Sequence, residues 1–307
     1  MMRTCFSYTA SLWCLLVFFS CKWDGGESNG KFKITTTTNI MADGVRALVK
    51  DSAEVTPLMA IGVDPHLYKA SQRDLDLLFE ADLVIYHGLH LEGKMTEVLR
   101  KFSRTHEVIN QGEYIQEDLL ITDPEFAGSV DPHIWFDVSL WKKAMTAVAA
   151  QLIKRKPSWK AYIEKNLVDY QTALDELDKH IRQEISLLTE KGQVLITAHD
   201  AFSYFGRAYA IEVKGLQGLS TLSEPGLHDV SQLVTFIVQN RIKAIFIEQS
   251  ISPKAIEAVV VGCKRRGYEV KMAGPLYTDS LGDPEGEAGS YIGMVKTNVR
   301  TIVENLK

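Results

Sequence analysis

Apolar positions along the chain fall into short β-rich runs that alternate with stretches of helical spacing. In the stretch 72–80, for example, Leu75, Leu78 and Phe79 recur at the spacing of one helix face. Runs typical of strands occupy residues 32–38, 54–60, 82–87 and 106–109, and a second set occupies 193–198, 209–214, 243–248 and 268–273. This order predicts an α/β protein of two lobes, each with a parallel sheet flanked by helices.

The longest uninterrupted helical pattern lies between these two sets and runs over residues 158–189. Pro157 precedes it and Gly192 follows it, as is typical of helix ends. Its apolar residues recur at three- and four-residue spacing: Ile163, Leu167, Tyr170, Leu174, Leu177, Ile181, Ile185 and Leu188. A single helix of this length would measure roughly 48 Å and could span both lobes. Two helices broken near Asp175, or a coiled-coil arm, are the alternatives. We expect a first lobe over residues 31–156, a bridging helix over 157–191 and a second lobe over 192–307.

The first 21 residues have the pattern of an export signal. Arg3 is followed by an apolar run at 12–19, which is too short to cross a bilayer core that takes about 20 helical residues. The run ends at Ser20-Cys21, which resembles a bacterial lipoprotein signal in which Cys21 carries the lipid and begins the mature chain. An ordinary cleaved signal or an uncleaved anchor is the alternative, because Phe18 and Phe19 depart from the usual lipoprotein pattern. Residues 22–30 are rich in Gly, Ser and Asn and are expected to form a flexible tether.

Composition and charge narrow the class of protein. With 46% hydrophobic and 24% charged residues, the chain is an ordinary globular one. Its 34 Lys and Arg against 39 Asp and Glu offer no basic surface for a phosphate backbone, so nucleic acid is not an expected partner. Beyond Cys21 the only cysteine is Cys263, which we expect to be a buried apolar residue and not a disulfide partner.

Two of the eight histidines stand in nearly duplicate settings. They occur in Asp64-Pro65-His66-Leu67-Tyr68 and in Asp131-Pro132-His133-Ile134-Trp135. In each segment Pro fixes the backbone before the imidazole, and an apolar and then an aromatic residue follow. A rigidly presented ring suits a metal ligand, although two structural core histidines would show the same pattern.

Two further candidate ligands follow strands of the second lobe. His199 ends the run 193–198, and Asp279 lies in the loop after the last strand. Binding groups in open α/β sheets gather beyond the carboxyl ends of the strands, so both are expected at the cleft. A packed imidazole and a helix N-cap are the alternatives. With His66 and His133 they would give three imidazoles and one carboxylate, two ligands from each lobe.

The remaining candidates have smaller roles. His90 follows a strand and is expected at the rim of the site, whereas His106, His180 and His228 are expected to be structural or exposed. Asp64, Asp131 and Asp200 stand beside ligands and could orient them, with turn capping as the alternative.

The sequence resembles the TroA-type zinc/manganese-binding proteins, the solute-binding components of metal ABC importers. The resemblance covers nearly all of residues 33–307. It rests on the motifs Gly62-Val63-Asp64-Pro65-His66, Gly88-Leu89-His90-Leu91-Glu92, Asp131-Pro132-His133-Ile134-Trp135-Phe136-Asp137, Thr197-Ala198-His199-Asp200-Ala201-Phe202, Gly215-Leu216-Gln217-Gly218-Leu219-Ser220-Thr221, Ile245-Phe246-Ile247-Glu248 and Tyr277-Thr278-Asp279-Ser280-Leu281-Gly282. The resemblance implies that His66, His133, His199 and Asp279 are the metal ligands and that one long helix bridges the two lobes. His87 stands where the family often has Asn.

This resemblance implies an exported, lipid-anchored, periplasmic or cell-surface protein and not an enzyme. It would be a monomer that delivers Zn²⁺ or Mn²⁺, with Fe²⁺ as a further cargo, to a cognate ABC permease and its ATPase. The ligand set favours zinc, but residues 110–131 lack the His-rich loop common in zinc importers, so the physiological metal stays open.

Three other functions are the alternatives. A surface lipoprotein that binds a macromolecular partner fits the export signal but leaves the four ligands unexplained. A zinc hydrolase would need an open coordination position and a general base, and the chain has no His-Glu-x-x-His motif. A siderophore or cobalamin receptor would predict a cleft lined by aromatic residues and Arg.

Overall fold

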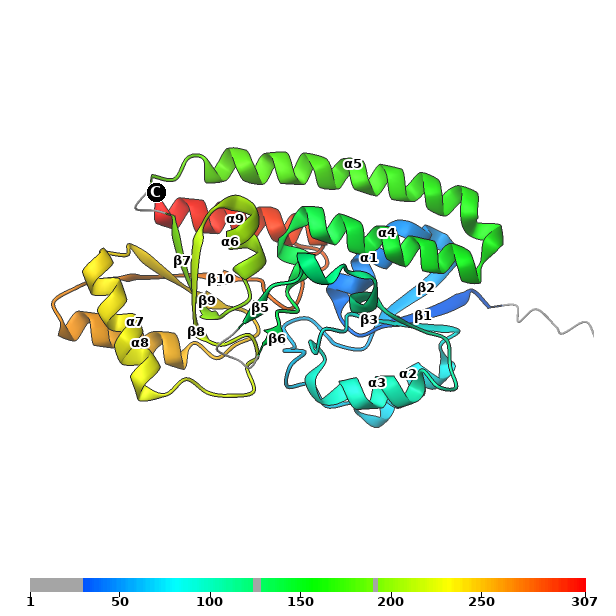
Figure 1. Cartoon of the computed structure of the whole chain (residues 1–307), viewed down its shortest axis with the longest axis horizontal. Coiled ribbons are helices and arrows are strands. Elements are labelled where there is room, and N and C mark those ends of the chain that lie inside the picture. Colours follow the sequence, from blue (N-terminus) through cyan, green and yellow to red (C-terminus); the bar gives the residue numbers. More distant parts are fainter. Residues whose placement is uncertain (1–29, 124–127, 190–192) are drawn as a thin grey trace, which may run out of the picture. The chain divides into compact units, whose positions relative to one another are not determined.

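Parallel strands form the centre of the first lobe, as the sequence predicts (Figure 1). The computed structural model describes residues 30–123, 128–189 and 193–307. The first sheet has the order β2-β1-β3-β4 and consists of β1 (Phe32–Thr36), β2 (Ala53–Pro57), β3 (Leu83–Tyr86) and β4 (Val108–Asn110). Its neighbouring strands all pair in parallel. The helices of this lobe are α1 (Asn39–Val49), α2 (Gln72–Glu80), α3 (Thr96–Phe102) and α4 (Val138–Arg155), and a small antiparallel pair joins β5 (Thr122–Asp123) to β6 (Ser129–Val130).

The second lobe repeats this arrangement. Its strands are β7 (Val194–His199), β8 (Glu212–Gln217), β9 (Ala244–Glu248) and β10 (Lys271–Leu276), and its helices are α6 (Ser203–Tyr209), α7 (Leu227–Asn240), α8 (Lys254–Arg265) and α9 (Tyr291–Leu306). β7 pairs in parallel with β8 and β9 with β10, and β7 lies beside β9 (Figure 1). The order β8-β7-β9-β10 therefore matches that of the first sheet, with the second strand at an edge in both lobes.

All eight strand predictions overlap an observed strand, with the largest shifts at β8 and β10. β8 begins at Glu212 and not at 209, because α6 continues to Tyr209 and Ala210 caps it in the left-handed conformation (φ 57°). β10 begins at Lys271 and not at 268, because Tyr268 still donates its backbone N–H to Cys263 at the end of α8. Helix C-caps therefore account for both shifts.

The long helix is continuous but shorter than the pattern predicts. α5 comprises 26 residues, Lys160–Ile185, and a 3-10 turn at Pro157–Trp159 precedes it. Its length is thus about 39 Å instead of 48 Å, and it is unbroken at Asp175. The periodicity continues to Leu188 because the turn after the helix also buries that side chain. α5 packs on α1 and α4 of the first lobe and on α6 and α9 of the second, so it lies along both lobes (Figure 1).

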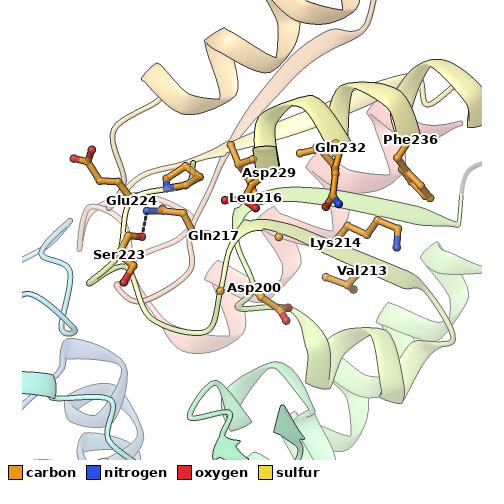
Figure 2. Close-up of a pocket in the computed structure, with 14 residues that line it drawn as sticks. Asp200, Val213, Lys214, Leu216, Gln217, Ser223, Glu224, Asp229, Gln232 and Phe236 are labelled. Atoms are coloured by element: carbon orange, nitrogen blue, oxygen red, sulfur yellow. Dashed lines mark hydrogen bonds between the residues drawn. The ribbon is translucent and has the colours of Figure 1, made fainter. Parts of the chain in front are cut away.

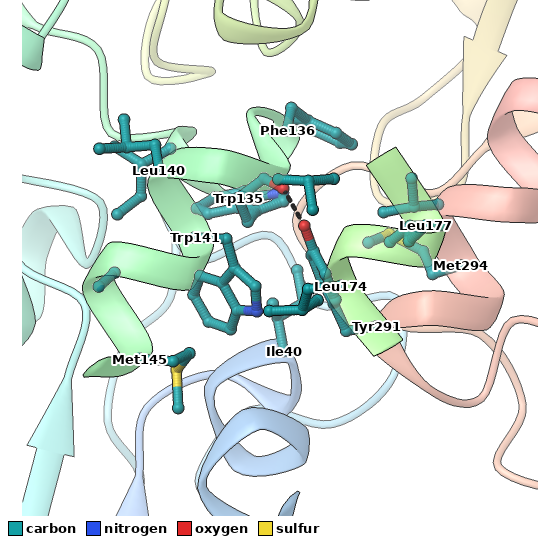
Figure 3. Close-up of a cluster of buried hydrophobic side chains, with 14 of the residues drawn as sticks. Ile40, Trp135, Phe136, Leu140, Trp141, Met145, Leu174, Leu177, Tyr291 and Met294 are labelled. Carbon is teal, nitrogen blue, oxygen red and sulfur yellow. Dashed lines mark hydrogen bonds between the residues drawn. The ribbon is translucent and has the colours of Figure 1, made fainter. Parts of the chain in front are cut away.

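The largest core cluster lies under this helix (Figure 3). The figure shows Trp141 of α4, Leu174 of α5 and Met294 of α9 converging there. Trp135 connects this core to the candidate site. Its carbonyl oxygen accepts the Tyr291 hydroxyl at 2.7 Å, and its indole Nε1 donates to the Thr278 carbonyl at 3.0 Å. His133 lies two residues before Trp135, and Asp279 directly follows Thr278. Both site residues are thereby tied to the same packed interior.

The expected signal, the lipidation site at Cys21 and residues 22–29 of the expected tether lie outside the described residues. Among the helices that are described, all are too short or too polar to cross a membrane.

Candidate metal centre

Four side chains that the sequence singles out converge at one point. The ligand atoms of His66, His133, His199 and Asp279 all lie within 4.8 Å of one another, and all four residues are buried. The His133 Nε2 atom is 3.4 Å from His66 Nε2 and 3.3 Å from His199 Nε2. The Asp279 carboxylate approaches the same point, with Oδ1 3.5 Å from His133 Nε2 and Oδ2 3.6 Å from His199 Nε2.

These spacings suit a small metal ion. Bonds of about 2.0–2.1 Å from a tetrahedral metal to four ligands place the ligands about 3.3–3.4 Å apart. Asp279 Oδ1 is buried without a hydrogen-bond partner among the described residues, which is costly for a carboxylate oxygen unless a cation meets it. The donor set and its spacing therefore fit one divalent cation.

Each candidate ligand stands on a short segment that the fold holds in place. His66 follows Pro65 in the loop between β2 and α2, and His133 follows Pro132 immediately before a 3-10 turn at Ile134–Phe136. His199 is the last residue of β7, and Asp279 lies in the loop after β10. Asp279 is not a helix N-cap, because Ser290 caps α9.

Two buried carboxylates orient two of the imidazoles. Asp131 Oδ1 accepts both the ring Nδ1–H of His133 at 2.7 Å and its backbone N–H at 2.8 Å. Glu248, at the end of β9, does the same for His199 with its two oxygens. With Nδ1 protonated, Nε2 of each ring is left free for a metal. The sequence singles out Asp131, but Glu248 enters only as part of a family motif, although an acid that ends an apolar strand is a signal for such a role.

Asp64 holds the backbone of His66 and not its ring, whereas Asp200 does not contact a candidate ligand ring through its carboxylate in the described part of the chain. Asp64 Oδ1 accepts the backbone N–H of His66 at 2.8 Å, and its Oδ2 accepts the hydroxyl of Thr221 in the second lobe at 2.5 Å. Asp200 Oδ1 accepts the Ser203 hydroxyl at 2.7 Å at the start of α6, which is the turn-capping alternative.

Burial and neighbouring charges shift the pKa values of the four side chains in different directions. Burial lowers the pKa of His66 to about 3, so this ring is neutral. Burial opposes a charge on His133 as well, but Asp131 and Asp279 outweigh it and raise its pKa to about 10. Glu248 and Asp279 likewise outweigh burial and raise the pKa of His199. Burial disfavours the Asp279 carboxylate, but the imidazoles outweigh that effect and hold its pKa below the usual range. Without a metal, the centre thus holds protons on imidazoles beside an ionised carboxylate.

His87 is buried next to this centre. Burial lowers its pKa to about 3, and its neutral ring donates Nε2–H to the Pro132 carbonyl at 2.7 Å and meets Trp135 edge-on. It therefore supports the segment that carries His133, although the sequence identifies it only as a departure from the family pattern.

His66 borders a cavity of about 380 Å³ next to the centre. His90 and Lys94 of the first lobe and Leu219 and Leu222 of the second also line it. His90 thus lies at the rim, as expected. Cys263 is buried, also as expected.

Comparison with known proteins places this geometry in a family. Residues 34–305 match the family described as zinc-uptake complex component A, periplasmic (ZnuA). The chain is 43% identical over 300 residues to the manganese-binding lipoprotein MntA of Bacillus subtilis, with 97% of this chain and 98% of that protein covered. It is 42% identical to the zinc-binding protein TroA of Treponema pallidum, with 91% and 90% covered.

Solved structures agree with these matches. The periplasmic zinc-binding protein TroA from Treponema pallidum superposes with a TM-score of 0.87 at 42% identity, with 90% of this chain and 99% of that chain covered. Fe(III)-bound YtgA from Chlamydia trachomatis superposes with a TM-score of 0.81 at 26% identity, with 90% and 98% covered. The match over nearly the whole chain confirms the resemblance inferred from the motifs, and the protein belongs to the family of periplasmic zinc-uptake components, which are uptake proteins and not enzymes.

Proposed function

We propose that His66, His133, His199 and Asp279 bind one divalent transition metal as cargo, and that the protein delivers it to an ABC permease for import. The observation that carries this proposal is the set of 3.3–3.6 Å contacts among the four buried ligand atoms. With four protein ligands the tetrahedral shell is closed, whereas a catalytic zinc keeps a position open for water. Storage and release of an ion therefore fit the centre better than hydrolysis.

The cargo is zinc, manganese or both, with iron as a further candidate. Three nitrogens and one carboxylate suit zinc, which also binds more tightly than manganese at most such sites. Both oxygens of Asp279 face the centre, so the carboxylate could bind through one or both and accommodate the higher coordination number of manganese. The relatives support either metal, because the manganese-binding and zinc-binding proteins named above are similar to this chain to nearly the same degree.

We further propose that the protein acts as a monomer outside the cytoplasmic membrane, anchored by a lipid on Cys21. The pattern at residues 12–21 supports this anchor, as do relatives that are named lipoproteins. Mass spectrometry of the chain isolated from its own host would show a diacylated Cys21 at the N-terminus; an unmodified cysteine there would contradict the anchor.

Elemental analysis tests the metal site. The full chain, purified in mild detergent from its own host, should carry about one equivalent of metal, and native mass spectrometry should identify it. His133→Ala and Asp279→Ala should each abolish this occupancy, while His228→Ala, on the exposed side of α7, should keep it. Full occupancy in both site variants would overturn the ligand assignment.

A further inference from the structure

The strand β8 is an edge strand with one free side. In the described residues it pairs only with β7. The Glu212 backbone N–H donates to Gln193 O at the β7 side, at 2.9 Å. Because successive residues of a strand direct their backbone groups to opposite sides, Val213 and Gly215 direct theirs away from β7. These groups are free to pair with another extended chain.

A groove of about 600 Å³ runs along this free side (Figure 2). β8 and the residues after it line one wall over 213–218. Asp229, Gln232 and Phe236, on successive turns of α7, form the opposite wall, and the loop at Ser223 and Glu224 lies at one end (Figure 2). The free edge therefore faces a defined groove and not open solvent.

The corresponding edge of the first lobe is blocked at Val55. There β2 is the edge strand, and the Arg46 guanidinium of α1 donates to the Val55 carbonyl at 2.6 Å. Among the described residues, no side chain makes such a hydrogen bond to the backbone of Val213 to Gly215. Since proteins usually block exposed strand edges, the open edge of β8 points to a partner.

The chemistry of the groove defines that partner. Three acidic residues line it, Asp200, Glu224 and Asp229, although Asp200 also accepts the Ser203 hydroxyl and Asp229 the Gly226 backbone N–H. Lys214 is the one basic residue among the described residues that line it, and it pairs with Glu212 at 3.2 Å. Apolar contacts come from Val213, Leu233 and Phe236. A chain with alternating basic and apolar side chains would match both properties, because an extended strand directs alternate side chains to opposite sides.

We propose that this groove binds an extended, basic segment of a partner protein, which adds to the sheet as a strand beside β8. Backbone hydrogen bonds to Val213 and Gly215 supply affinity, and the carboxylates select for positive charge. This interaction is independent of the metal centre and would hold whichever cargo the protein carries.

A peptide of alternating lysine and valine, acetylated and amidated at its ends, provides the probe. When it is added to the metal-loaded full chain in detergent, hydrogen exchange should slow at the amides of Val213 and Gly215. The same peptide with an N-methyl group on every backbone amide keeps its charge but has no backbone N–H to donate from either edge, so it should bind at least tenfold more weakly. Equal affinity of the two peptides, or protection that does not include β8, would overturn the proposal.

Two charge-reversal variants distinguish peptide binding in the groove from general electrostatic attraction to the protein. Glu224→Lys should weaken binding about fivefold, because it places a cation at the groove. Glu54→Lys, an equal charge change at an exposed position of β2, should leave binding unchanged. Equal losses in the two variants would mean that the peptide binds through net charge alone.

Discussion

The Glu248 carboxylate holds His199 at two points: Oε2 accepts the ring Nδ1–H at 2.6 Å, and Oε1 accepts the backbone N–H at 2.9 Å. Asp131 holds His133 in the same way. Each lobe thus fixes the tautomer and the position of one imidazole before any cargo arrives. At His66 the neighbouring carboxylate, Asp64, accepts the backbone N–H.

We expect Glu248→Gln to weaken metal binding about 10–100-fold, because loss of the charged acceptor frees the His199 ring and lowers its basicity. Competition with a chelator of known affinity measures the effect for zinc and for manganese. Glu257→Gln removes an exposed carboxylate on α8 and should leave the affinity unchanged. Equal affinities for the wild type and Glu248→Gln would contradict the role assigned to this contact.

Metal binding at pH 7.5 should release at least one proton. The pKa of His133 is raised to about 10, so its ring is protonated at this pH and must lose a proton to accept a metal at Nε2. His66, with its pKa near 3, contributes none. Affinity should therefore keep rising with pH beyond the ordinary histidine range and level off only near pH 10.

Calorimetry in buffers of different ionisation enthalpy counts the released protons. A binding enthalpy that does not depend on the buffer would contradict the raised pKa of His133. Affinity measured from pH 6 to 9 gives a second test, since a plateau above pH 7 would mean that an unperturbed histidine controls binding.

Much of this centre could be predicted from the sequence because its signals are local. All four candidate ligands can be identified from the few residues around each one. The signals are the repeated Asp-Pro-His segments and the positions of His199 and Asp279 after strands. Glu248 shows the limit of such signals. It lies 49 positions from His199, and only the pairing of β7 and β9 side by side brings the two residues together.

The ends of helices and strands are likewise not determined by local sequence alone. The spacing of apolar residues identifies α5, but Leu188 is buried by a turn and so extends the pattern beyond the helix. The groove beside β8 also has no local signal, because an edge strand and a central parallel strand carry similar apolar residues. Sheet order, and not composition, leaves that edge open.

Replacing Leu174 by Ala should lower the free energy of unfolding by about 2–5 kcal/mol. The side chain is fully buried beneath α5 among residues of both lobes, so its loss leaves a cavity in the shared core. Val168 lies on the same helix with 60% of its surface exposed, and Val168→Ala should change stability by about 0.5 kcal/mol or less. Urea unfolding followed by circular dichroism compares the two. Similar losses in both variants would contradict the assignment of the effect to core packing, because Ala has the higher helix propensity in both cases.

The hydrogen bond between Asp64 and Thr221 joins the loops of the two lobes next to the centre, and its loss should speed metal release. Asp64 Oδ2 accepts the Thr221 hydroxyl at 2.5 Å while Oδ1 holds the backbone of His66. Thr221→Val keeps the side-chain shape but removes the hydroxyl donor of the partly buried Asp64 Oδ2, at a cost of about 1–2 kcal/mol in the metal-bound protein. The dissociation rate should rise about five- to thirtyfold, measured by stopped-flow transfer of zinc to a fluorescent chelator. Thr235→Val, at a half-buried position of α7 in the second lobe, is the matched control because its hydroxyl bonds to the Ser231 carbonyl of its own helix and to the exposed Arg266. An unchanged rate in Thr221→Val would contradict this prediction and would mean that metal release does not require this contact to break.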